Sequence, residues 1–514
     1  MSSYALSDGA EPHSDPPGAQ PLRAPSGWTW RSALSLATIV LVLETVAIHP
    51  LLVTSAMPAI KSHFDLTGSG WILTSFVLVG AAAAPLAGKL ADLHGKRRML
   101  LICMALGACG SLVSAAATGV WVLVLGRSLS GLLVPCLFLG YSLIRDIFPP
   151  KTIALAVSIS ATATSLAVVA ATHVTEWLVD AQGFRAVFWV TAIVLGVLAI
   201  ALTLTTPESP VRLDIRVRGI GAVIVGAALA SALIGVSRGP VHGWSAASTL
   251  VFLAIAAALF ALWLITAKTT EDALIDRRLW RRRPVVLTAV TAGLGYAVVG
   301  TYTMLLPMLT MVPAMLGLGY GFGVDAKGVS TFQAPLAVMT IIGGLVVGAL
   351  VGRGAVEPRL TAMAGMVATT AGCALTAYSH HSEHRLMVFA AVVGLGVGLT
   401  YASIPNLLIE AVPAQVQASA AALVGVFQGV IPAIVPIVVF ATLDGGYQAE
   451  LPPMITKMLN GAIVYSDDGF KVGFLIAAAV ALLGVLTTLL LPRAVEEADL
   501  DSIIPTGSAP EKVN

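Results

Sequence analysis

The chain has 514 residues, of which 57% are hydrophobic and only 11% are charged, and its formal net charge at pH 7 is +2. Soluble globular domains carry about 25% charged residues, so this composition excludes a water-soluble globule and predicts a polytopic membrane protein. A net charge so close to zero gives no reason to expect a nucleic-acid partner.

The first 31 residues differ from the rest of the chain, because they are rich in Pro, Ser, Gly and Ala and contain no apolar core. They therefore lack the hydrophobic segment of a signal peptide. We expect a disordered cytoplasmic tail, with the first apolar run acting as the signal for membrane insertion.

Fourteen apolar runs follow this tail, each long enough to cross a bilayer as a helix. They occupy residues 32–58, 68–90, 98–117, 120–145, 152–179, 185–205, 218–238, 247–266, 285–312, 327–351, 360–379, 385–408, 416–442 and 471–491. The run at 327–351 is the weakest, because Gln333, Pro335 and glycines interrupt it. If this run were not a membrane span, every later loop would move to the opposite side of the membrane and the bias of Lys and Arg would be lost. With all fourteen runs, the Lys and Arg residues concentrate on one side, which predicts that both termini are cytoplasmic.

The segment from Gly88 to Leu100, GKLADLHGKRRML, crowds Lys and Arg side chains and one aspartate between two apolar runs. Such charge cannot lie in hydrocarbon, so we predict a short loop on the cytoplasmic side, where Lys and Arg are retained. Two glycines, an acid and a basic pair stand at offsets that resemble the loop between helices two and three of major facilitator superfamily transporters. The matching positions are Gly88, Leu90, Asp92, Gly95, Lys96 and Arg97.

The resemblance implies that this loop is a conformational latch, formed by Gly88, Asp92, Gly95 and Arg97. Asp92 is placed to interact with the positive N-terminal end of a neighbouring helix or with a basic side chain. The alternative is that the charged side chains of Asp92 and Arg97 only keep a cytoplasmic turn in contact with water. The second-half counterpart, Gly348 to Leu360, has no aspartate, so only the first copy is complete.

Further segments extend the similarity along the chain. They are Arg127–Gly131, Arg145–Pro150, Gly183–Arg185 and Pro405–Pro413, and the basic connector Ala273–Pro284 resembles the loop that precedes the second bundle in the fourteen-helix drug:proton antiporter family. Members of the superfamily have two bundles of six helices, each made of inverted three-helix repeats, with the substrate site between the bundles. The resemblance therefore implies an all-α fold of fourteen transmembrane helices, two of which are additional to the bundles.

This plan divides the chain into five parts. We expect a disordered cytoplasmic tail at 1–31, an N-terminal six-helix bundle at 32–206, two inserted helices and a basic cytoplasmic linker at 207–284, a C-terminal six-helix bundle at 285–492 and a cytoplasmic tail at 493–514.

Two segments depart from the family pattern. His49 and Thr54 stand where the first helix usually carries an acid and an asparagine, and Ala171–Glu176 replaces the glycine-rich element associated with antiport in the fifth helix. Glycines let helices approach closely, so their loss changes the packing there. The motifs support a conformationally switching transporter, but they do not by themselves establish drug antiport.

Five ionisable side chains are expected at membrane depth, where an unpaired charge costs about 2.5–3.5 kcal/mol. They are Glu44, His49, Arg127, His173 and Glu176. We predict that they carry proton coupling, with Glu44 or Glu176 paired with Arg127 in one conformation and protonated in another. A histidine can also titrate near neutral pH. The alternatives are that Glu44 is only a structural partner of Arg127, that His49 only packs, and that His173 and Glu176 face external water.

The polar residues expected to line a substrate cavity are Tyr296, Tyr302, Gln333 and Gln428, although aromatic and amide side chains at helical spacing also serve as packing. Because the membrane segments carry few charges, such a cavity suits amphipathic or hydrophobic compounds better than sugars.

The sequence therefore predicts a monomeric secondary transporter of the plasma membrane that exports such small molecules by alternating access, coupled to protons. The alternatives are a facilitator or importer without proton antiport, and a lipid-binding or sensing protein on a transporter scaffold. An enzyme is not predicted, because the external loops, including Asp444 to Phe470, offer no grouped acid, base and nucleophile and no metal-ligand spacing. There is no nucleotide-binding loop, and the four cysteines lie inside apolar runs, so no cofactor or metal is expected.

Overall fold

The computed structural model describes residues 29–64, 70–163, 174–175, 177–210, 246–269, 282–324, 326–413, 416–447 and 464–492, single positions between 221 and 238, and residues 279 and 449. Within these ranges, every regular element is a helix. The prediction of an all-α fold is confirmed for this part of the chain.

The helices up to residue 205 are called the first half. They are α1 (Trp30–Ser55), α2 (Met57–Phe64), α3 (Gly70–His94), α4 (Lys96–Ala115), α5 (Val120–Ser130), the 3-10 turn η1 (Gly131–Leu133), α6 (Cys136–Ile147), α7 (Pro150–Thr162) and α9 (Arg185–Thr205).

The helices from residue 283 onward are called the second half. They are α13 (Arg283–Thr310), the 3-10 turn η2 (Ala314–Leu316), α14 (Ala326–Gly352), α15 (Pro358–Ser379), α16 (Glu383–Ala411), α17 (Gln417–Asp444) and α19 (Asp467–Leu489), and α11 (Ala247–Thr269) precedes them. The weakest predicted span, 327–351, is thus part of a continuous helix, α14.

Among the described residues, eleven helices are long and apolar enough to cross a membrane, and two shorter apolar helices lie at 152–162 and 247–263. The seventh predicted span, 218–238, is described only at scattered positions. The described residues therefore support a multi-pass membrane protein without fixing the count at fourteen.

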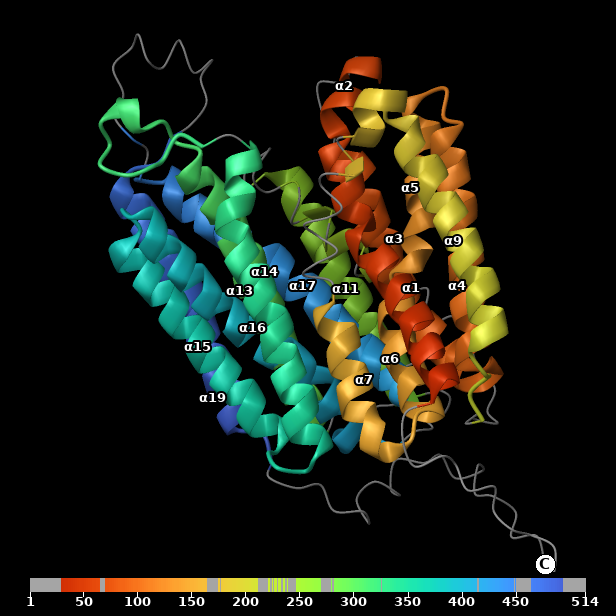
Figure 1. Cartoon of the computed structure of the whole chain (residues 1–514). Coiled ribbons are helices and arrows are strands. Elements are labelled where there is room, and N and C mark those ends of the chain that lie inside the picture. The colour runs from red at the N-terminus through yellow and green to blue at the C-terminus, as the bar shows by residue number, and fades with distance from the viewer. Residues whose placement is uncertain are drawn as a thin grey trace, which may run out of the picture.

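The two halves lie side by side, the first in red to yellow and the second in green to blue (Figure 1). Within the first half α4 packs against α5 and α9, and within the second half α14 and α15 both pack against α16. Between the halves, α17 packs on α3 and α6, and α7 packs on α14 and α16. These crossing contacts determine where a site shared by the halves can lie.

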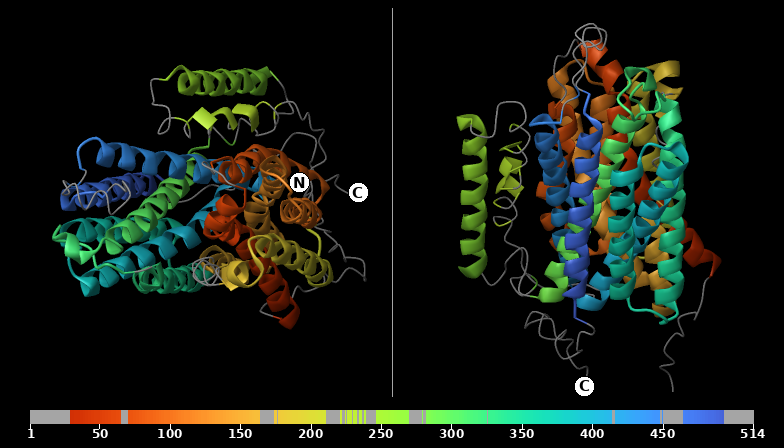
Figure 2. Two further views of the ribbon diagram at one scale, coloured as in Figure 1. Left: turned by 90° about the horizontal axis from the view of Figure 1, so that it is seen from above. Right: turned by 90° about the vertical axis from the view of Figure 1, so that its left-hand side faces the viewer.

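The helix α11 lies outside the two halves, as both views in Figure 2 show. Two glycines of the preceding predicted span pack closely against neighbouring helices. A Cβ atom added to Gly226 would lie 3.1 Å from Ala82 Cβ of α3, and a Cβ atom added to Gly235 would lie 2.8 Å from Leu253 Cδ2 of α11. The described helix of the inserted segment, α11, is therefore peripheral.

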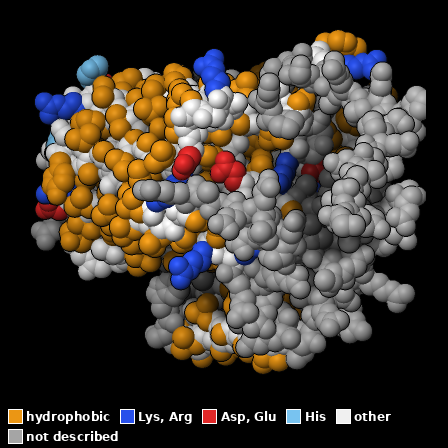
Figure 3. Space-filling view, turned by 90° about the horizontal axis from the view of Figure 1, so that it is seen from below, with side chains coloured by type: hydrophobic (Ala, Val, Ile, Leu, Met, Phe, Trp, Pro, Cys, Tyr) orange, Lys and Arg blue, Asp and Glu red, His pale blue; other side chains and the backbone are white. Residues whose placement is uncertain are grey.

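The outward faces of the helices are apolar. On α9, Trp189, Ile193, Val197 and Ile200 are all exposed at the three- and four-residue spacing of one helix face. An exposed apolar face like that of α9 is unusual in a soluble monomer, but it suits contact with lipid tails. The view from below looks toward the lower ends of the helices, where charged side chains lie among the hydrophobic side chains of the second half (Figure 3).

The halves approach closely where α7 meets α14, because α14 has two glycines there. A Cβ atom on Gly344 would lie 2.2 Å from Thr162 Cγ2, and one on Gly348 would lie 2.8 Å from Leu155 Cδ1. The two glycines are spaced four apart and so share one face, as in the small-x-x-x-small packing of membrane helices.

Candidate functional site

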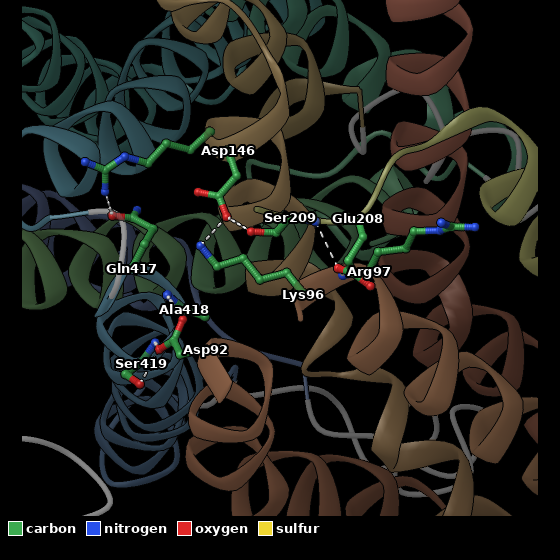
Figure 4. Close-up of polar contacts among 10 residues, drawn as sticks. Asp92, Lys96, Arg97, Asp146, Glu208, Ser209, Gln417, Ala418 and Ser419 are labelled. Carbon is green, nitrogen blue, oxygen red and sulfur yellow. Dashed lines mark hydrogen bonds and ion pairs between the residues drawn. The ribbon is translucent and has the colours of Figure 1, made fainter. Parts of the chain in front are cut away.

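Asp92, in the last turn of α3, reaches across to the second half. Its carboxylate accepts hydrogen bonds from the backbone N–H groups of Ala418 (3.3 Å) and Ser419 (3.0 Å) and from the Ser419 hydroxyl (2.7 Å). These N–H groups belong to the first turn of α17, which has no acceptors of its own for them. Asp92 therefore caps a helix of the other half (Figure 4), where the positive end of the helix dipole favours a carboxylate.

Two neighbours of Asp92 also cross between the halves. Arg145, near the end of α6, donates a hydrogen bond to the side-chain oxygen of Gln417. Gly88 lies one turn before Asp92, and a Cβ atom there would be 2.9 Å from the carbonyl oxygen of Ala418. A glycine at this position lets α3 approach the start of α17 closely enough for the Asp92 cap.

A buried ion pair lies close to this crossing, but within the first half. Lys96 Nζ is 2.6 Å from Asp146 Oδ2, and both side chains are fully buried. The Ser209 hydroxyl donates to the same carboxylate oxygen (Figure 4). The pair ties the start of α4 to the end of α6 and to the segment that follows α9.

Gly95 and Arg97 connect α3 to α4 and also contact only the first half in their described hydrogen bonds. Gly95 has a φ of 107°, in the region that glycine adopts readily. The Glu208 carboxylate accepts from the Arg97 backbone N–H (2.9 Å), and the Arg97 guanidinium donates to the carbonyl oxygen of Thr203 (2.6 Å). Of the four predicted latch residues, Gly88 and Asp92 therefore touch the second half, whereas Gly95 and Arg97 shape the loop that carries them.

Arg127, inside the first half, is paired with His49. Arg127 Nη1 lies 2.6 Å from His49 Nε2, and Arg127 Nε donates to the carbonyl oxygen of Ile72 at 3.2 Å. The Phe76 ring packs against both side chains, with its centroid 4.7 Å from the guanidinium carbon and 5.2 Å from the imidazole centroid. Both Arg127 and His49 have 0% exposure.

The predicted pairing of Arg127 with Glu44 or Glu176 in one conformation stays a prediction, because Glu176 lies outside the described residues. In the described contacts Arg127 meets His49 rather than Glu44, because Glu44 lies five residues earlier on α1 and so on a different face. Arginine carries only hydrogen-bond donors, so His49 Nε2 is the acceptor and the imidazole is neutral in this conformation.

Glu44 instead lies at the boundary between the halves. Its carboxylate is close enough to Tyr141 of α6 and Tyr296 of α13 to interact with them electrostatically. The Tyr296 ring stacks on that of Tyr401 from α16, with centroids 4.2 Å apart and an interplanar angle of 16°. All three tyrosines are half-buried, and Glu44 thus lies near tyrosine side chains from both halves.

The other residues predicted to line a cavity take two different positions. Tyr302 has 0% exposure, its hydroxyl lies 3.2 Å from that of Thr376, and its ring packs against Phe474. Tyr302 is therefore a core residue of the second half in this structure, which corrects its assignment to a cavity. Gln333 on α14 and Gln428 on α17 are half-buried.

Two of the predicted proton-coupling residues, His173 and Glu176, lie outside the described residues, as does most of the segment 171–176. Their roles remain predictions.

A group of metal-capable side chains appears where the sequence suggested none. His380 and His381 follow the end of α15, Asp467 begins α19, and their ligand atoms all lie within 4.8 Å of one another. The spacing along the chain gave no sign of this group, which forms only when the ends of α15 and α19 come together. The group could not be recognised from the sequence, because 87 positions separate His380 from Asp467.

Sequence reasoning also missed several partners: Gln417, Ser419, Glu208, Ser209, Tyr141 and Tyr401. The only local signal was the serine in the first turn of α17, since Ser is favoured at helix starts. The others become visible only when the helices are placed side by side.

The comparisons with known proteins agree with this geometry. A model of the Major Facilitator Superfamily matches residues 34–436. The chain is 29% identical over 393 residues to the multidrug resistance protein Stp of Mycobacterium tuberculosis, covering 74% of this chain and 70% of Stp. It is 24% identical over 381 residues to the multidrug transporter protein MdtP of Bacillus subtilis, covering 72% and 67%.

Solved structures share the fold. The proton:xylose symporter XylE superposes with a TM-score of 0.63 at 13% identity, covering 90% of this chain and 97% of that chain. The human organic anion transporter MFSD10 superposes with a TM-score of 0.59 at 12% identity, covering 89% and 98%. At these identities the likeness concerns the fold alone.

Proposed function

The chain belongs to the Major Facilitator Superfamily, and on that premise we propose that it exports amphipathic or hydrophobic small molecules in exchange for protons. Its similarity to Stp and MdtP, both named for multidrug resistance or transport, supports this substrate class. The proposal places a monomer in the plasma membrane, with both termini in the cytoplasm and no bound cofactor.

The proposed architecture has fourteen transmembrane helices. It consists of cytoplasmic tails at 1–31 and 493–514, six-helix bundles at 32–206 and 285–492, and two inserted helices with a basic linker at 207–284. The contacts within each half and the peripheral position of α11 support this division.

Alternating access would depend on the crossing at Asp92. The proposal assigns this structure to the state that is closed toward the cytoplasm, because Asp92 caps α17 and Arg145 donates to Gln417 at the cytoplasmic ends of their helices. Opening toward the cytoplasm would expose the first N–H groups of α17 and separate α7 from α14. Asp92 and Gly88 act directly in this latch, while Gly95 and Arg97 hold the loop that carries Asp92.

The proposed proton coupling is supported by the buried pair of Arg127 and His49. His49 accepts from Arg127 only while it is neutral, since a protonated imidazole has no acceptor. A proton arriving from outside would break this bond and place two cations side by side in the core. Protonation of His49 therefore disfavours the present arrangement, and the proton contributes about 2.3 kcal/mol when it moves down a potential of ~100 mV.

The substrate would lie between the halves, beside Glu44 and the stacked pair Tyr296 and Tyr401. A carboxylate near tyrosine side chains suits a compound with a positive charge and an apolar body. Gln333 and Gln428 are further candidates for contact with the substrate, and His173 and Glu176 for the proton route.

Transport in reconstituted vesicles tests this proposal. With a lipophilic cation as substrate, an imposed pH gradient should drive accumulation in the wild type, and His49→Asn should abolish the dependence on the gradient, because asparagine can still accept from Arg127 but does not titrate. Arg127→Ala should have the same effect.

The matched control is His384→Asn, since His384 is an exposed histidine and should leave gradient-driven transport unchanged. Flux that ignores the gradient in the wild type would indicate a facilitator or importer, and binding without flux would indicate a sensor. Full gradient dependence in His49→Asn would exclude His49 as the coupling group.

A further inference from the structure

The ends of α15 and α19 bring two histidines and an aspartate together. His380 and His381 directly follow α15 (Pro358–Ser379), and Asp467 is the first residue of α19 (Asp467–Leu489). The two helices pack against each other, so these three side chains are held by a rigid pair of helices. In the proposed topology this end of the second half faces outward.

The three side chains converge on one point. His380 Nε2 lies 2.9 Å and His381 Nε2 lies 3.0 Å from the same oxygen, Asp467 Oδ1. The two imidazole rings stack with centroids 4.6 Å apart and an interplanar angle of 18°, so both rings present the same edge to the carboxylate. In a tetrahedral zinc site, metal–ligand bonds of about 2.0–2.2 Å separate the ligand atoms by roughly 3.3 Å. Small outward shifts would therefore admit an ion.

A second contact of His380 determines which of its ring nitrogens faces the aspartate. His380 Nδ1 lies 3.0 Å from the backbone carbonyl oxygen of Thr376, which can only accept, so Nδ1 carries the hydrogen. Nε2 is consequently the ring nitrogen that faces Asp467 Oδ1, and it can hold either a second hydrogen or a metal ion between itself and the carboxylate. A carbonyl that holds the far nitrogen of a histidine is the usual outer partner of a metal-bound imidazole.

Burial holds the His380 side chain in its position next to Asp467. The His380 side chain is only 1% exposed, whereas Asp467 is 38% and His381 is 50% exposed. His380 therefore cannot rotate into water, and the group opens to solvent on one side. Among the described residues, Arg385 donates to Ser379 and Lys471 lies over the Tyr378 ring, so neither cation is paired with Asp467.

We propose that His380, His381 and Asp467 bind a divalent transition-metal ion of the zinc class, with a solvent molecule as the fourth ligand. Two imidazoles and one carboxylate are a donor set that suits Zn²⁺ and related ions. The carbonyl end of α15 adds favourable negative potential for a cation. The bound ion would fasten the outer ends of α15 and α19 to each other.

A proton alone is the competing cation. One proton on His380 could bridge it to Asp467, while a neutral His381 with its hydrogen on Nε2 could donate to the same oxygen. A divalent ion would instead be held by both rings and the carboxylate at once, and saturable metal binding separates the two arrangements.

Metal binding to the purified full-length chain tests the proposal. The protein is stripped with a chelator and titrated with Zn²⁺ by calorimetry and with Co²⁺ by visible absorption, which reports tetrahedral coordination. We expect one ion per chain and a rise in the unfolding temperature on adding Zn²⁺. His380→Ala and Asp467→Asn should weaken binding at least ~10-fold, the lower limit seen when even an outer partner is lost.

Two further variants keep the test decisive. His381 is half exposed, so His381→Ala should fold normally yet lose the tight binding and the thermal stabilisation by Zn²⁺. His384→Ala removes a nearby exposed histidine outside the group and should bind as the wild type does. The proposal is overturned if the wild type shows no saturable Zn²⁺ binding, or if His381→Ala and Asp467→Asn bind as tightly as the wild type.

Discussion

At the scale of single residues, Asp92 shows how one carboxylate joins two parts of a membrane protein. It satisfies two backbone N–H groups and one hydroxyl of α17 while it is 1% exposed. Without Asp92, these N–H groups would be left without an acceptor in a buried place, where an unsatisfied donor costs about 1–3 kcal/mol. The cap exists only while α3 and α17 stay in contact, so in the proposed cycle its energy belongs to one conformation.

Asp92→Ala should therefore shift the conformational equilibrium toward the cytoplasm-open state. Loss of a helix cap costs about 0.5–2 kcal/mol, and a change of ~1 kcal/mol alters a population ratio about 5-fold. Distances between spin labels on the cytoplasmic ends of α3 and α17, measured in the purified protein, should show more of the open state, and transport should fall at normal membrane abundance.

Asp180→Ala is the control for this measurement, because Asp180 is an exposed acid with no contact to the second half in the described residues. It should leave the distance distribution unchanged. An unchanged distribution in Asp92→Ala would show that the cap does not hold the closed state.

At the scale of elements, the close contact between the two halves depends on small residues on one face of a helix. Gly344 and Gly348 of α14 let this helix approach α7 of the other half. Helices in lipid gain little from the hydrophobic effect against one another, so close packing has to supply the attraction. The contact between α7 and α14 is thus sensitive to a single methyl group.

Gly348→Ala should weaken the closed state by about 1–3 kcal/mol, the usual cost of overpacking. The new Cβ atom would lie 2.8 Å from Leu155 Cδ1 and 3.0 Å from Leu155 Cα, so the side chain alone cannot make room and the helices must separate. Cross-linking between cysteines placed on α7 and α14 should become slower.

The same substitution at Gly300 on α13 provides the comparison, since a Cβ atom there would meet nothing within 4 Å. Gly300→Ala should cross-link at the wild-type rate. Equal rates in the two glycine variants would mean that α14 does not need Gly348 for its contact with α7.

At the scale of the whole molecule, the proposed transport cycle requires the two halves to separate at the end that carries Asp92. Gly88 of α3 faces Ala422 of α17, and a Cβ atom on Gly88 would lie 3.0 Å from Ala422 Cβ. Disulfides usually span Cβ atoms about 3.5–4.5 Å apart, so a pair of cysteines at these positions needs only a slight separation to form one.

The double variant Gly88→Cys/Ala422→Cys, in a background without the four native cysteines, should therefore form a disulfide under oxidising conditions and stop transport. Reduction should return the flux to the level of the Gly88→Cys single variant, because the halves can then part again while the added side chain still crowds Ala418. Each single cysteine variant should be insensitive to the oxidant. Normal transport by the fully cross-linked protein would show that this end does not open during the cycle.

The sequence by itself determined the features that depend on local composition. Long apolar runs predicted the helices, including the interrupted run that becomes α14 (Ala326–Gly352), and the charge-rich segment Gly88 to Leu100 predicted the turn between α3 and α4. The superfamily could be identified from motifs such as this one, because their glycines and charges stand at fixed spacing along the chain.

Only the tertiary structure decided which side chains meet. Asp92 meets Ser419 across 327 positions, Arg127 meets His49 across 78, and His380 meets Asp467 across 87. Tyr302 was placed in a cavity by its polarity, but packing puts it in the core. The physical reason is that both the lipid-facing and the protein-facing sides of a membrane helix are apolar, so the pattern that marks the inner face of a soluble helix is missing. Hydrophobicity alone therefore specifies that these helices cross the membrane, but the packing of small residues and buried polar groups decides which faces come together.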